Sequence, residues 1–281
     1  MTTTLDKLLQ QGRDRLAKTS ASPGLDAEIL LGHVLKVNRA HLYANPDREL
    51  QADIATEYLA LVGLRSDGQP IAHLTGEREF WSLSLQVSPD VLVPRPETEL
   101  LVERALACIP DDADCRVLDL GCGSGAIAIA LASERPMCRF VATDASEAAL
   151  AIARLNAERH HTDRIEFVAG RWFEPLAGQR FDVIVSNPPY VATGRPDLTD
   201  RELDFEPAEA LYSGADGLDD IRRIIAGASE HLQSGGWLLL EHGFDQSASI
   251  GALLQQAGFG AVTTCDDLAG LPRVTAAQLK R

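Results

Sequence analysis

The tetrapeptide Asn187-Pro188-Pro189-Tyr190 presents groups that suit the binding of a planar group carrying an NH₂. Two consecutive prolines fix two φ angles and remove two backbone donors, so the segment is stiff and rich in carbonyl acceptors. Asn187 adds a side-chain carbonyl and an NH₂, and Tyr190 adds a flat ring for stacking. Because none of these groups is a nucleophile or a strong base, the pattern predicts positioning of an amide or an exocyclic amine. A tight turn is the alternative interpretation, since Asn-Pro often opens turns.

The segment before this tetrapeptide predicts where it lies in the fold. Residues 181–186 (Phe-Asp-Val-Ile-Val-Ser) are mostly apolar and β-branched, which is typical of a buried strand in a parallel sheet. Open α/β sheets bind ligands outside the carboxyl ends of their strands. We therefore expect Asn187 to lie at the binding edge of such a sheet.

A second candidate site is the glycine-rich loop after the predicted strand 116–120. Glycines between a strand and a helix let a ligand approach the backbone closely. Asp144, at the end of the next predicted strand, suits the two hydroxyls of a ribose. With Ala126 the loop also fits G-x-G-x-x-A, so the motif alone is compatible with a dinucleotide site. The loop residues are Gly121, Cys122, Gly123, Ser124 and Gly125.

Asp119 discriminates between the two kinds of ligand. It stands two residues before Gly121, at the carboxyl end of the predicted strand, where a carboxylate would repel a pyrophosphate. It suits a ligand with positive charge, such as the sulfonium and amino groups of S-adenosylmethionine. The alternative role for Asp144 is to cap the next helix, which Ser146 can do instead.

Composition restricts the possible class of protein. The chain has 281 residues, 45% of them hydrophobic, so one large or two modest domains are expected. Its formal net charge of -15 and the lack of a Lys/Arg cluster argue against direct DNA binding. The N-terminal sequence does not resemble a signal peptide, and no apolar run is long enough to cross a membrane. Five scattered cysteines suggest neither a disulfide framework nor a zinc site, so a cytoplasmic location is expected.

The order of predicted elements indicates an α/β protein with a small N-terminal helical domain. Apolar positions in residues 1–75 fit helices over 5–16, 25–35 and 54–62. Residues 76–98 are predicted to form a hairpin and linker. Residues 99–281 alternate strands with helices, which predicts a doubly wound parallel sheet with an antiparallel pair at one edge. The strands expected there are 116–120, 139–143, 165–168, 181–186, 237–241, 261–265 and 273–278, and the helices include 127–131, 147–159, 218–232 and 250–256.

The linker contains a further candidate site residue. Pro94 and Pro96 predict an extended segment that displays Arg95 and Glu97. Thr98 is expected to cap the helix that follows. Arg95 is a candidate substrate contact, and the alternative is a linker residue held by a salt bridge.

Several motifs together resemble one enzyme family. Residues 119–125 resemble the cofactor loop of class I (Rossmann-like) methyltransferases. Asn187–Tyr190 resembles the signature of amino methyltransferases that act on adenine, cytosine or glutamine amides. The helical N-terminal region and further stretches are similar to the HemK/PrmC release factor glutamine methyltransferases, so the likeness covers nearly the whole chain. Those stretches are 76–81, 91–99, 205–207, 210–211 and 214–218.

The resemblance implies a reaction and a set of site residues. The reaction is methylation of the side-chain amide nitrogen of the glutamine in the Gly-Gly-Gln loop of class I peptide chain release factors, with S-adenosylmethionine as methyl donor. Residues 121–125 and Asp144 would hold the cofactor, and Trp172 would lie against its adenine. Asn187 would contact both cofactor and substrate. The glutamine amide would be gripped by Asn187, Pro188, Pro189 and Tyr190.

One position departs from the family pattern. The family often has an acid immediately before the position of Trp172, and this chain has Arg171. A backbone carbonyl is therefore the expected acceptor for the adenine amino group. Arg171 is also the only support for a rival class, a binding protein that kept the fold and lost turnover.

The expected mechanism is orientation. The side-chain carbonyl of Asn187 and the backbone carbonyl of Pro188 would accept the two amide hydrogens and hold the nitrogen opposite the methyl group. Tyr190 has a reference pKa near 10 and is a poor base, so the proton is expected to leave to solvent.

Two regions are expected to meet the partner protein. The polar segment 191–204 is predicted to be a mobile flap or a partner-binding loop. The N-terminal domain is expected to recognise the release factor body, or alternatively to act as a stabilising appendage. The nearest rival function is methylation of a glutamine in a ribosomal protein; a DNA adenine methyltransferase fits the acidic charge less well.

Overall fold

The structure, a computed structural model, describes residues 3–194 and 201–280, and it divides into two compact units. The first unit comprises Met1–Glu77 together with Thr199–Phe205. The second comprises Arg78–Leu198 and Glu206–Arg281. The chain therefore leaves the second unit after the Asn187 loop, contributes a short segment to the first, and returns.

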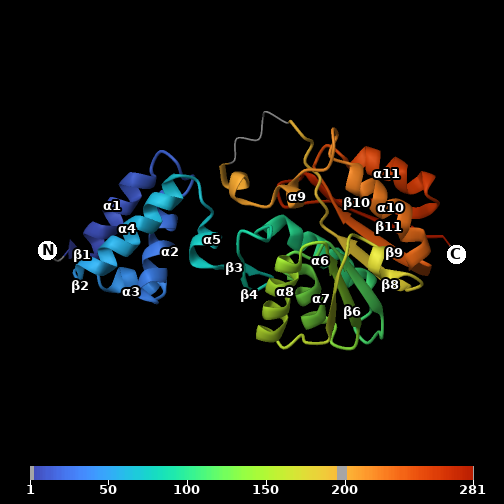
Figure 1. Ribbon diagram of the computed structural model, residues 1–281, viewed down its shortest axis with the longest axis horizontal. Coiled ribbons are helices and arrows are strands. Elements are labelled where there is room, and N and C mark those ends of the chain that lie inside the picture. Colours follow the sequence, from blue (N-terminus) through green and yellow to red (C-terminus); the bar gives the residue numbers. More distant parts are fainter. Residues whose placement is uncertain (1–2, 195–200, 281) are drawn as a thin grey trace. The chain divides into compact units, whose positions relative to one another are not determined.

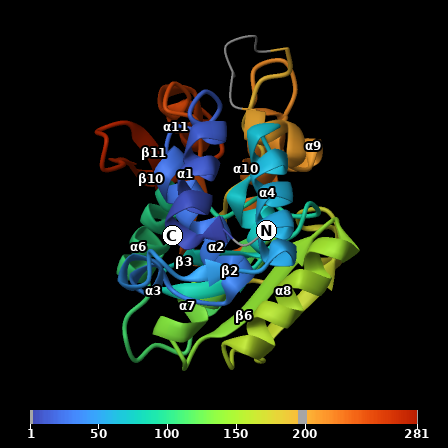
Figure 2. The same ribbon diagram turned by 90° about the vertical axis from the view of Figure 1, so that its left-hand side faces the viewer.

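The first unit is built on α1 (Leu5–Leu16), α2 (Pro23–Leu35) and α4 (Ala52–Ser66), which pack as one bundle (Figures 1 and 2). Leucines and Tyr58 form its buried core. These three helices are confirmed. The sequence did not indicate the smaller elements, because a few residues show no periodicity. They are α3 (Arg39–Ala44), α5 (Ile71–Thr75), the 3₁₀ turn η3 (Arg201–Phe205), and the strands β1 (Thr3–Thr4) and β2 (Glu49–Leu50).

The second unit contains a seven-stranded sheet in the order β10-β11-β9-β8-β5-β6-β7. β9, β8, β5, β6 and β7 run parallel, and β11 is antiparallel to both β9 and β10. The predicted edge pair is thus confirmed. The strands are β5 (Arg116–Leu120), β6 (Arg139–Asp144), β7 (Ile165–Ala169), β8 (Phe181–Ser186), β9 (Leu232–Glu241), β10 (Phe259–Asp266) and β11 (Pro272–Leu279).

Helices cover both faces of this sheet (Figure 1). Successive strand residues point to opposite faces, as the period of two requires: Val117 belongs to one core cluster and Leu118 to the other. The first cluster includes side chains of α6 (Glu99–Cys108), α7 (Ala126–Glu134) and α8 (Glu147–Arg159). The second includes side chains of α10 (Asp219–His231) and α11 (Ser247–Gln256). The doubly wound architecture expected from the alternating pattern is confirmed.

The segment before the sheet forms the expected hairpin, with β3 (Glu77–Phe80) and β4 (Leu83–Gln86). The linker differs from the prediction at one point. Pro96–Thr98 form a 3₁₀ turn (η1), so Glu97 is not extended, whereas Arg95 is. Thr98 precedes α6 in a helical conformation and makes no side-chain cap, so the predicted capping role is wrong. Two further short elements complete the unit: the 3₁₀ turn η2 (Glu174–Leu176) and α9 (Ala208–Leu211).

The predicted segment 191–204 is described only in part, because residues 195–200 lie outside the described residues. Within residues 3–194 and 201–280, no helix is long and apolar enough to span a membrane.

Candidate active site

The parallel register of the sheet brings the predicted site residues into one row. Leu120 lies opposite Ser186 of β8 and Thr143 of β6, so the loops that follow these strands are neighbours. Ser186 strengthens this alignment by donating its hydroxyl to the Leu120 carbonyl at 2.7 Å. The chain reverses its strand order between β5 and β8, which is the switch point where such sheets bind ligands. The row runs from Glu241 at the end of β9, through Asn187 and Gly121, to Asp144 and the turn that carries Trp172.

The glycine loop is held by backbone contacts to the neighbouring strand. The amides of Gly121 and Cys122 both donate to the Thr143 carbonyl, at 2.8 and 2.9 Å. Gly121 and Gly125 have φ angles of 72° and 82°, in the left-handed region that glycine adopts without strain. A Cβ at Gly121 would lie 3.2 Å from the Trp172 ring, so this ring packs directly onto the loop.

Asp144 is bonded to the glycine loop and is not the N-cap of the helix that follows, α8. Its Oδ2 accepts the Gly123 amide at 2.8 Å, and its Oδ1 accepts the Ser146 amide at 2.9 Å. Ser146 is the N-cap of α8, where its hydroxyl accepts the Ala149 amide at 3.2 Å. Asp144 is half-buried and lines the pocket, so its carboxylate remains accessible to a ligand.

Asp119 lies behind the glycine loop. It is 1% exposed and does not line the pocket. Its Oδ2 accepts the Ala128 amide in the first turn of α7 at 3.1 Å, whereas Oδ1 has no hydrogen-bond partner. Burial raises the pKa of Asp119 to about 7, and the charge of Asp144 adds to this effect. The residue therefore supplies an acceptor that Gly125, the N-cap of α7, has no side chain to provide.

Asn187 is half-buried, and a residue far away in the sequence orients it. Its Nδ2 donates to Oγ1 of Thr98 at 3.2 Å. The Thr98 hydroxyl in turn lies beside the carboxyl of Glu241 and favours its charged form. Since the NH₂ of Asn187 is engaged with Thr98, its Oδ1 is the atom left for a ligand.

Glu241 is a buried carboxyl beneath this loop. It is 1% exposed, and its Oε1 accepts the hydroxyl of Tyr190 at 3.3 Å. Burial raises the pKa of Glu241 to about 7, although Thr98, Arg273 and Tyr190 act in the opposite direction. Burial and the Glu241 charge also raise the pKa of Tyr190, so its phenol is neutral and remains a hydrogen-bond donor.

These residues surround a pocket of about 470 Å³, which lies in the usual range for small-molecule sites. Its walls come from the linker, the glycine loop, the ends of β6 and β7, the Asn187 loop and the start of α10. The predicted site residues that line it are Arg95, Gly121, Cys122, Gly123, Ser124, Asp144, Trp172, Asn187 and Pro189; those outside its wall are Asp119, Gly125, Pro188 and Tyr190.

Arg95 lines the pocket and also forms the ion pair considered as its alternative role. Its guanidinium donates to Oε2 of Glu206 at 2.8 Å, and the Glu206 side chain is fully buried. Arg95 is thus held in place from within the second unit, with its side chain about one quarter exposed.

Three residues of this site had no functional role in the sequence-based prediction. Thr98 contacts Asn187, Glu241 contacts Tyr190, and Asp220 lies in the pocket wall beside Trp172. Only their positions at strand ends and helix starts could have indicated them. Their partners are 89, 51 and 48 residues away in the sequence.

The fold, the glycine loop and the Asn187 loop at the adjacent strand end define a Rossmann-like methyltransferase. In agreement, the family described as Methyltransferase small domain matches residues 97–204. The family described as PrmC N-terminal domain matches residues 7–76.

Curated relatives narrow this class. A release factor glutamine methyltransferase of Xylella fastidiosa (strain Temecula1 / ATCC 700964) is 50% identical, over 92% of this chain and 94% of that protein. The protein of the same name from Escherichia coli (strain K12) is 47% identical, over 92% of this chain and 93% of that protein. The chain belongs to the release factor glutamine methyltransferase family.

Solved structures agree on the fold. A methyltransferase from Pyrococcus furiosus matches with a TM-score of 0.54 at 18% identity, over 80% of this chain and 100% of that chain. The 16S rRNA N2 G1207 methyltransferase RsmC of T. thermophilus, solved with AdoMet and guanosine, matches with a TM-score of 0.56 at 22% identity, over 73% of this chain and 50% of that chain. At such identities the likeness concerns the fold alone.

Proposed function

We propose that this protein transfers a methyl group from S-adenosylmethionine to the side-chain amide nitrogen of the glutamine in the Gly-Gly-Gln loop of class I release factors. The observation that carries the proposal is the placement of Asn187 beside the glycine loop, with its NH₂ held by Thr98 and its Oδ1 left for a ligand. The family supplies the identity of the acceptor.

The pocket residues fit S-adenosylmethionine. A carboxylate at the end of β6 suits the ribose hydroxyls, and Asp144 lines the pocket there. The Trp172 ring, which packs on Gly121, offers a flat surface for adenine. Gly121 and Gly123 have no side chains to block close approach to the backbone. Asp119 places a buried carboxyl behind the loop, and its charged form, which predominates above pH 7, favours a ligand with positive charge.

Orientation of the acceptor amide is the main task of the protein. An amide nitrogen is a poor nucleophile because its lone pair is delocalised into the carbonyl, whereas the bound cofactor supplies a methyl group on an electrophilic sulfonium. Asn187 Oδ1 accepts one amide hydrogen, which pins the nitrogen in a reactive orientation; Pro188, the second acceptor expected from the sequence, lies outside the pocket wall. Orientation of this kind can contribute on the order of 7–11 kcal/mol.

The proton released by the methylated amide goes to solvent. Tyr190 has a raised pKa and its hydroxyl points to Glu241, so it does not act as a base. Glu241 itself does not line the pocket. Both residues instead stiffen the Asn187 loop from behind.

The first unit is assigned to recognition of the release factor body. Its helices carry no catalytic constellation, and it includes residues 199–205, which follow the Asn187 loop in the chain. Because release factors act at the ribosome, we place the reaction in the cytoplasm.

Methyl transfer from labelled S-adenosylmethionine to a purified class I release factor tests the proposal. The matched control is the same release factor with Gln→Ala in its Gly-Gly-Gln loop. We expect label on the unchanged factor only. Label on neither, with cofactor binding intact, would favour a ribosomal protein as the substrate or a binding protein without turnover.

A further inference from the structure

Asp220, the second residue of α10, is a carboxylate in the pocket wall that the reaction proposed above does not use. It is 4% exposed. Its Oδ1 accepts the Trp172 indole Nε1–H at 3.2 Å. The same oxygen accepts Arg171 at 3.0 Å and Arg223 at 2.8 Å. The indole that is expected to stack on adenine is therefore tied to a buried anion.

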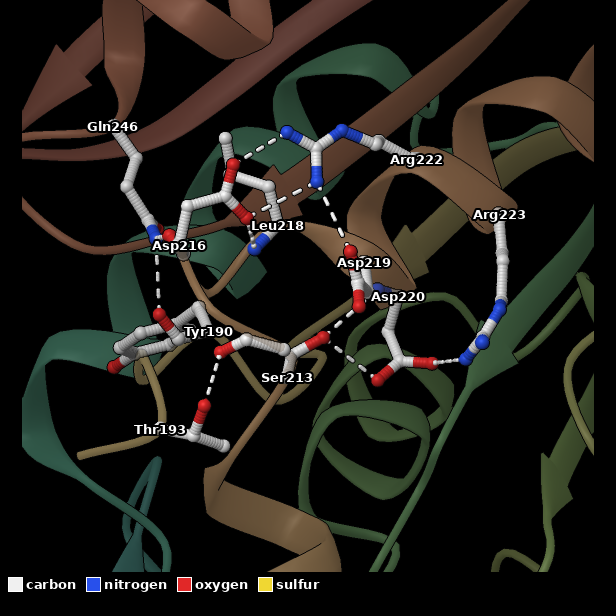
Figure 3. Close-up of polar contacts among 11 residues, drawn as sticks. Tyr190, Thr193, Ser213, Asp216, Leu218, Asp219, Asp220, Arg222, Arg223 and Gln246 are labelled. Atoms are coloured by element: carbon white, nitrogen blue, oxygen red, sulfur yellow. Dashed lines mark hydrogen bonds and ion pairs between the residues drawn. The ribbon is translucent and has the colours of Figure 1, made fainter.

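The other oxygen of Asp220 holds a different segment. Its Oδ2 accepts the hydroxyl of Ser213 at 2.8 Å, and the Asp220 amide donates back to that hydroxyl at 2.8 Å (Figure 3). Ser213 is 3% exposed, so this reciprocal pair is shielded from water. A buried hydrogen bond to a charged group is stronger than a neutral one.

Ser213 is in turn bonded to the chain that leaves the Asn187 loop. Its amide donates to the Val191 carbonyl at 2.9 Å. The amide and the hydroxyl of Thr193 both donate to the Gly214 carbonyl, at 2.8 and 3.1 Å. Tyr190 is held from the same side, because Gln246 Nε2 donates to its carbonyl at 2.9 Å (Figure 3). A continuous set of hydrogen bonds thus joins the Trp172 ring to the residues that follow Tyr190.

The charge of Asp220 is stable in this environment. Burial raises its pKa, but hydrogen bonds from Ser213, Arg171 and Arg223 outweigh burial and leave the pKa below its usual value. As a carboxylate it is an acceptor only, so it can satisfy the indole with one oxygen and Ser213 with the other. Arg171, which departs from the family pattern, is one of its counter-ions.

Hydrogen bonds hold both the backbone and the ring of Trp172. Its φ is 50°, in the left-handed region that is costly for a residue with a side chain. The carbonyl of Trp172 is fixed by the Thr143 hydroxyl at 3.3 Å, and its indole is fixed by Asp220. The ring is thus positioned by its packing on Gly121 and by the hydrogen bond from its indole to Asp220.

We propose, on the basis of the proposed function, that Asp220 is a positioning residue that orients Trp172 for the cofactor through one oxygen and steadies the Asn187 loop through Ser213 with the other. It acts through these two residues and does not touch the reacting atoms.

The first test compares Asp220→Asn with Asp219→Asn. Trp172 and Ser213 donate to different oxygens of Asp220, and Asn replaces one of these two acceptors by an NH₂ donor, so one of the two hydrogen bonds is lost. We expect Asp220→Asn to weaken S-adenosylmethionine binding about ten-fold by calorimetry, and also to lower kcat with the release factor. Asp219 is exposed and paired with Arg222, so Asp219→Asn should leave both values within two-fold of wild type. An unchanged cofactor Kd in Asp220→Asn overturns the proposal.

A double-mutant cycle separates positioning from a general loss of structure. Trp172→Phe keeps a ring but removes the indole N–H, so Asp220→Asn should weaken cofactor binding much less in that background than in wild type. Equal losses in both backgrounds would mean that Asp220 acts on stability alone. Thermal unfolding of each variant shows whether it is folded at the assay temperature.

Ser213→Ala tests the second part of the proposal, the hydrogen bond between Asp220 and Ser213. It leaves the bond from Asp220 to Trp172 intact, so the cofactor Kd should stay within two-fold of wild type while kcat, or KM for the release factor, worsens several-fold. Wild-type values throughout would overturn the role of Ser213. Calorimetric binding needs no methyl acceptor, so a wild type that binds cofactor but does not methylate the release factor refutes the proposed acceptor without affecting the test of Asp220.

Discussion

At the scale of single residues, side-chain acceptors decide which atoms face the pocket. Thr98 accepts a hydrogen bond from the NH₂ of Asn187, which leaves the Asn187 Oδ1 for a ligand. Asp144 accepts a hydrogen bond from the Gly123 amide, and Asp220 accepts one from the Trp172 indole. Each of these side chains is selected for orientation rather than for acid–base chemistry, as expected for a reaction whose electrophile is already activated.

Asn187→Ala should reduce turnover at least about 10²-fold, because the acceptor amide loses the group that orients it. The Kd for S-adenosylmethionine should change by less than about three-fold. The matched variant is Thr98→Val, which keeps the shape of Thr98 but frees the Asn187 amide to rotate, and it should show a smaller loss of turnover. Steady-state kinetics and calorimetry measure both values, and normal turnover in Asn187→Ala would refute the mechanism.

Asp119 makes the stability of the protein depend on pH. Its pKa is raised to about 7 by burial, so the folded state binds a proton that the unfolded state has already released at pH 5. Stability conferred by this group is therefore present at low pH and is lost as the pH rises through 7. We compare the free energy of unfolding of Asp119→Asn with that of wild type. The difference should shift in favour of the variant by roughly 2–3 kcal/mol between pH 5 and pH 8. Urea unfolding of the cofactor-free protein at both pH values measures the change, and a constant difference would contradict it.

At the scale of elements, glycine lets α7 pack closely against α8. Gly125 has a φ of 82°, and a Cβ there would lie 3.0 Å from the Ile129 Cδ1 and 3.2 Å from the Ala153 Cβ. Because Gly125 has no side chain, the start of α7 can lie this close to α8, and this position also fixes where the glycine loop ends. The first turn of α7 also donates a hydrogen bond, from the Ala128 amide to Asp119 of β5.

Gly125→Ala should destabilise the protein more than Gly178→Ala. Both positions have a left-handed φ, so both variants bear the backbone cost of about 1–2 kcal/mol. Only the Cβ at Gly125 meets other atoms, whereas nothing lies within 4 Å of one at Gly178, so the difference should be roughly 1–3 kcal/mol. Urea unfolding of the two variants tests this, and equal losses would show that packing is not the reason for the glycine.

At the scale of the whole molecule, a short part of the chain beyond the Asn187 loop, which includes η3, belongs to the first unit. Within that unit, Arg65 of α4 pairs with Glu202 of η3 at 2.7 Å and with Asp26 of α2 at 2.7 Å. In this cluster, the side chains of Arg65 and Asp26 are 10% and 6% exposed, whereas that of Glu202 is 30% exposed. The η3 turn is thus held by the helices to which release factor recognition is assigned.

Glu202→Gln should raise KM for the release factor several-fold, because the segment after the Asn187 loop loses its ion pair with Arg65. The cofactor Kd should be unchanged, since none of the described residues of the first unit lines the pocket. Glu57→Gln, an exposed position on α4, serves as the control. Steady-state kinetics with varied release factor gives the answer; an unchanged KM would refute the role of this cluster.

The sequence by itself determined the element types, the sheet class and the main loops of the site, because these depend on local signals. Short apolar runs indicated β5–β9, the lack of a helix between the last two predicted strands indicated the antiparallel edge pair, and period-3.6 patterns indicated the long helices. The glycine loop and Asn187–Tyr190 could be placed at strand ends from the chain order alone. Short helices and the 3₁₀ turn at Pro96–Thr98 could not, since they have no periodicity.

The tertiary structure alone decided which residues support those loops. Thr98 and Asn187 are 89 positions apart, and Arg95 and Glu206 are 111 apart, so no local pattern connects them. The parallel register aligns the ends of β6, β5, β8 and β9, and packing of α6 and α10 against the sheet then delivers Thr98 and Asp220 to the same edge. Hydrogen bonds across such distances depend on how the elements pack, which is why the partners of Asn187 and Trp172 emerged only from the folded chain.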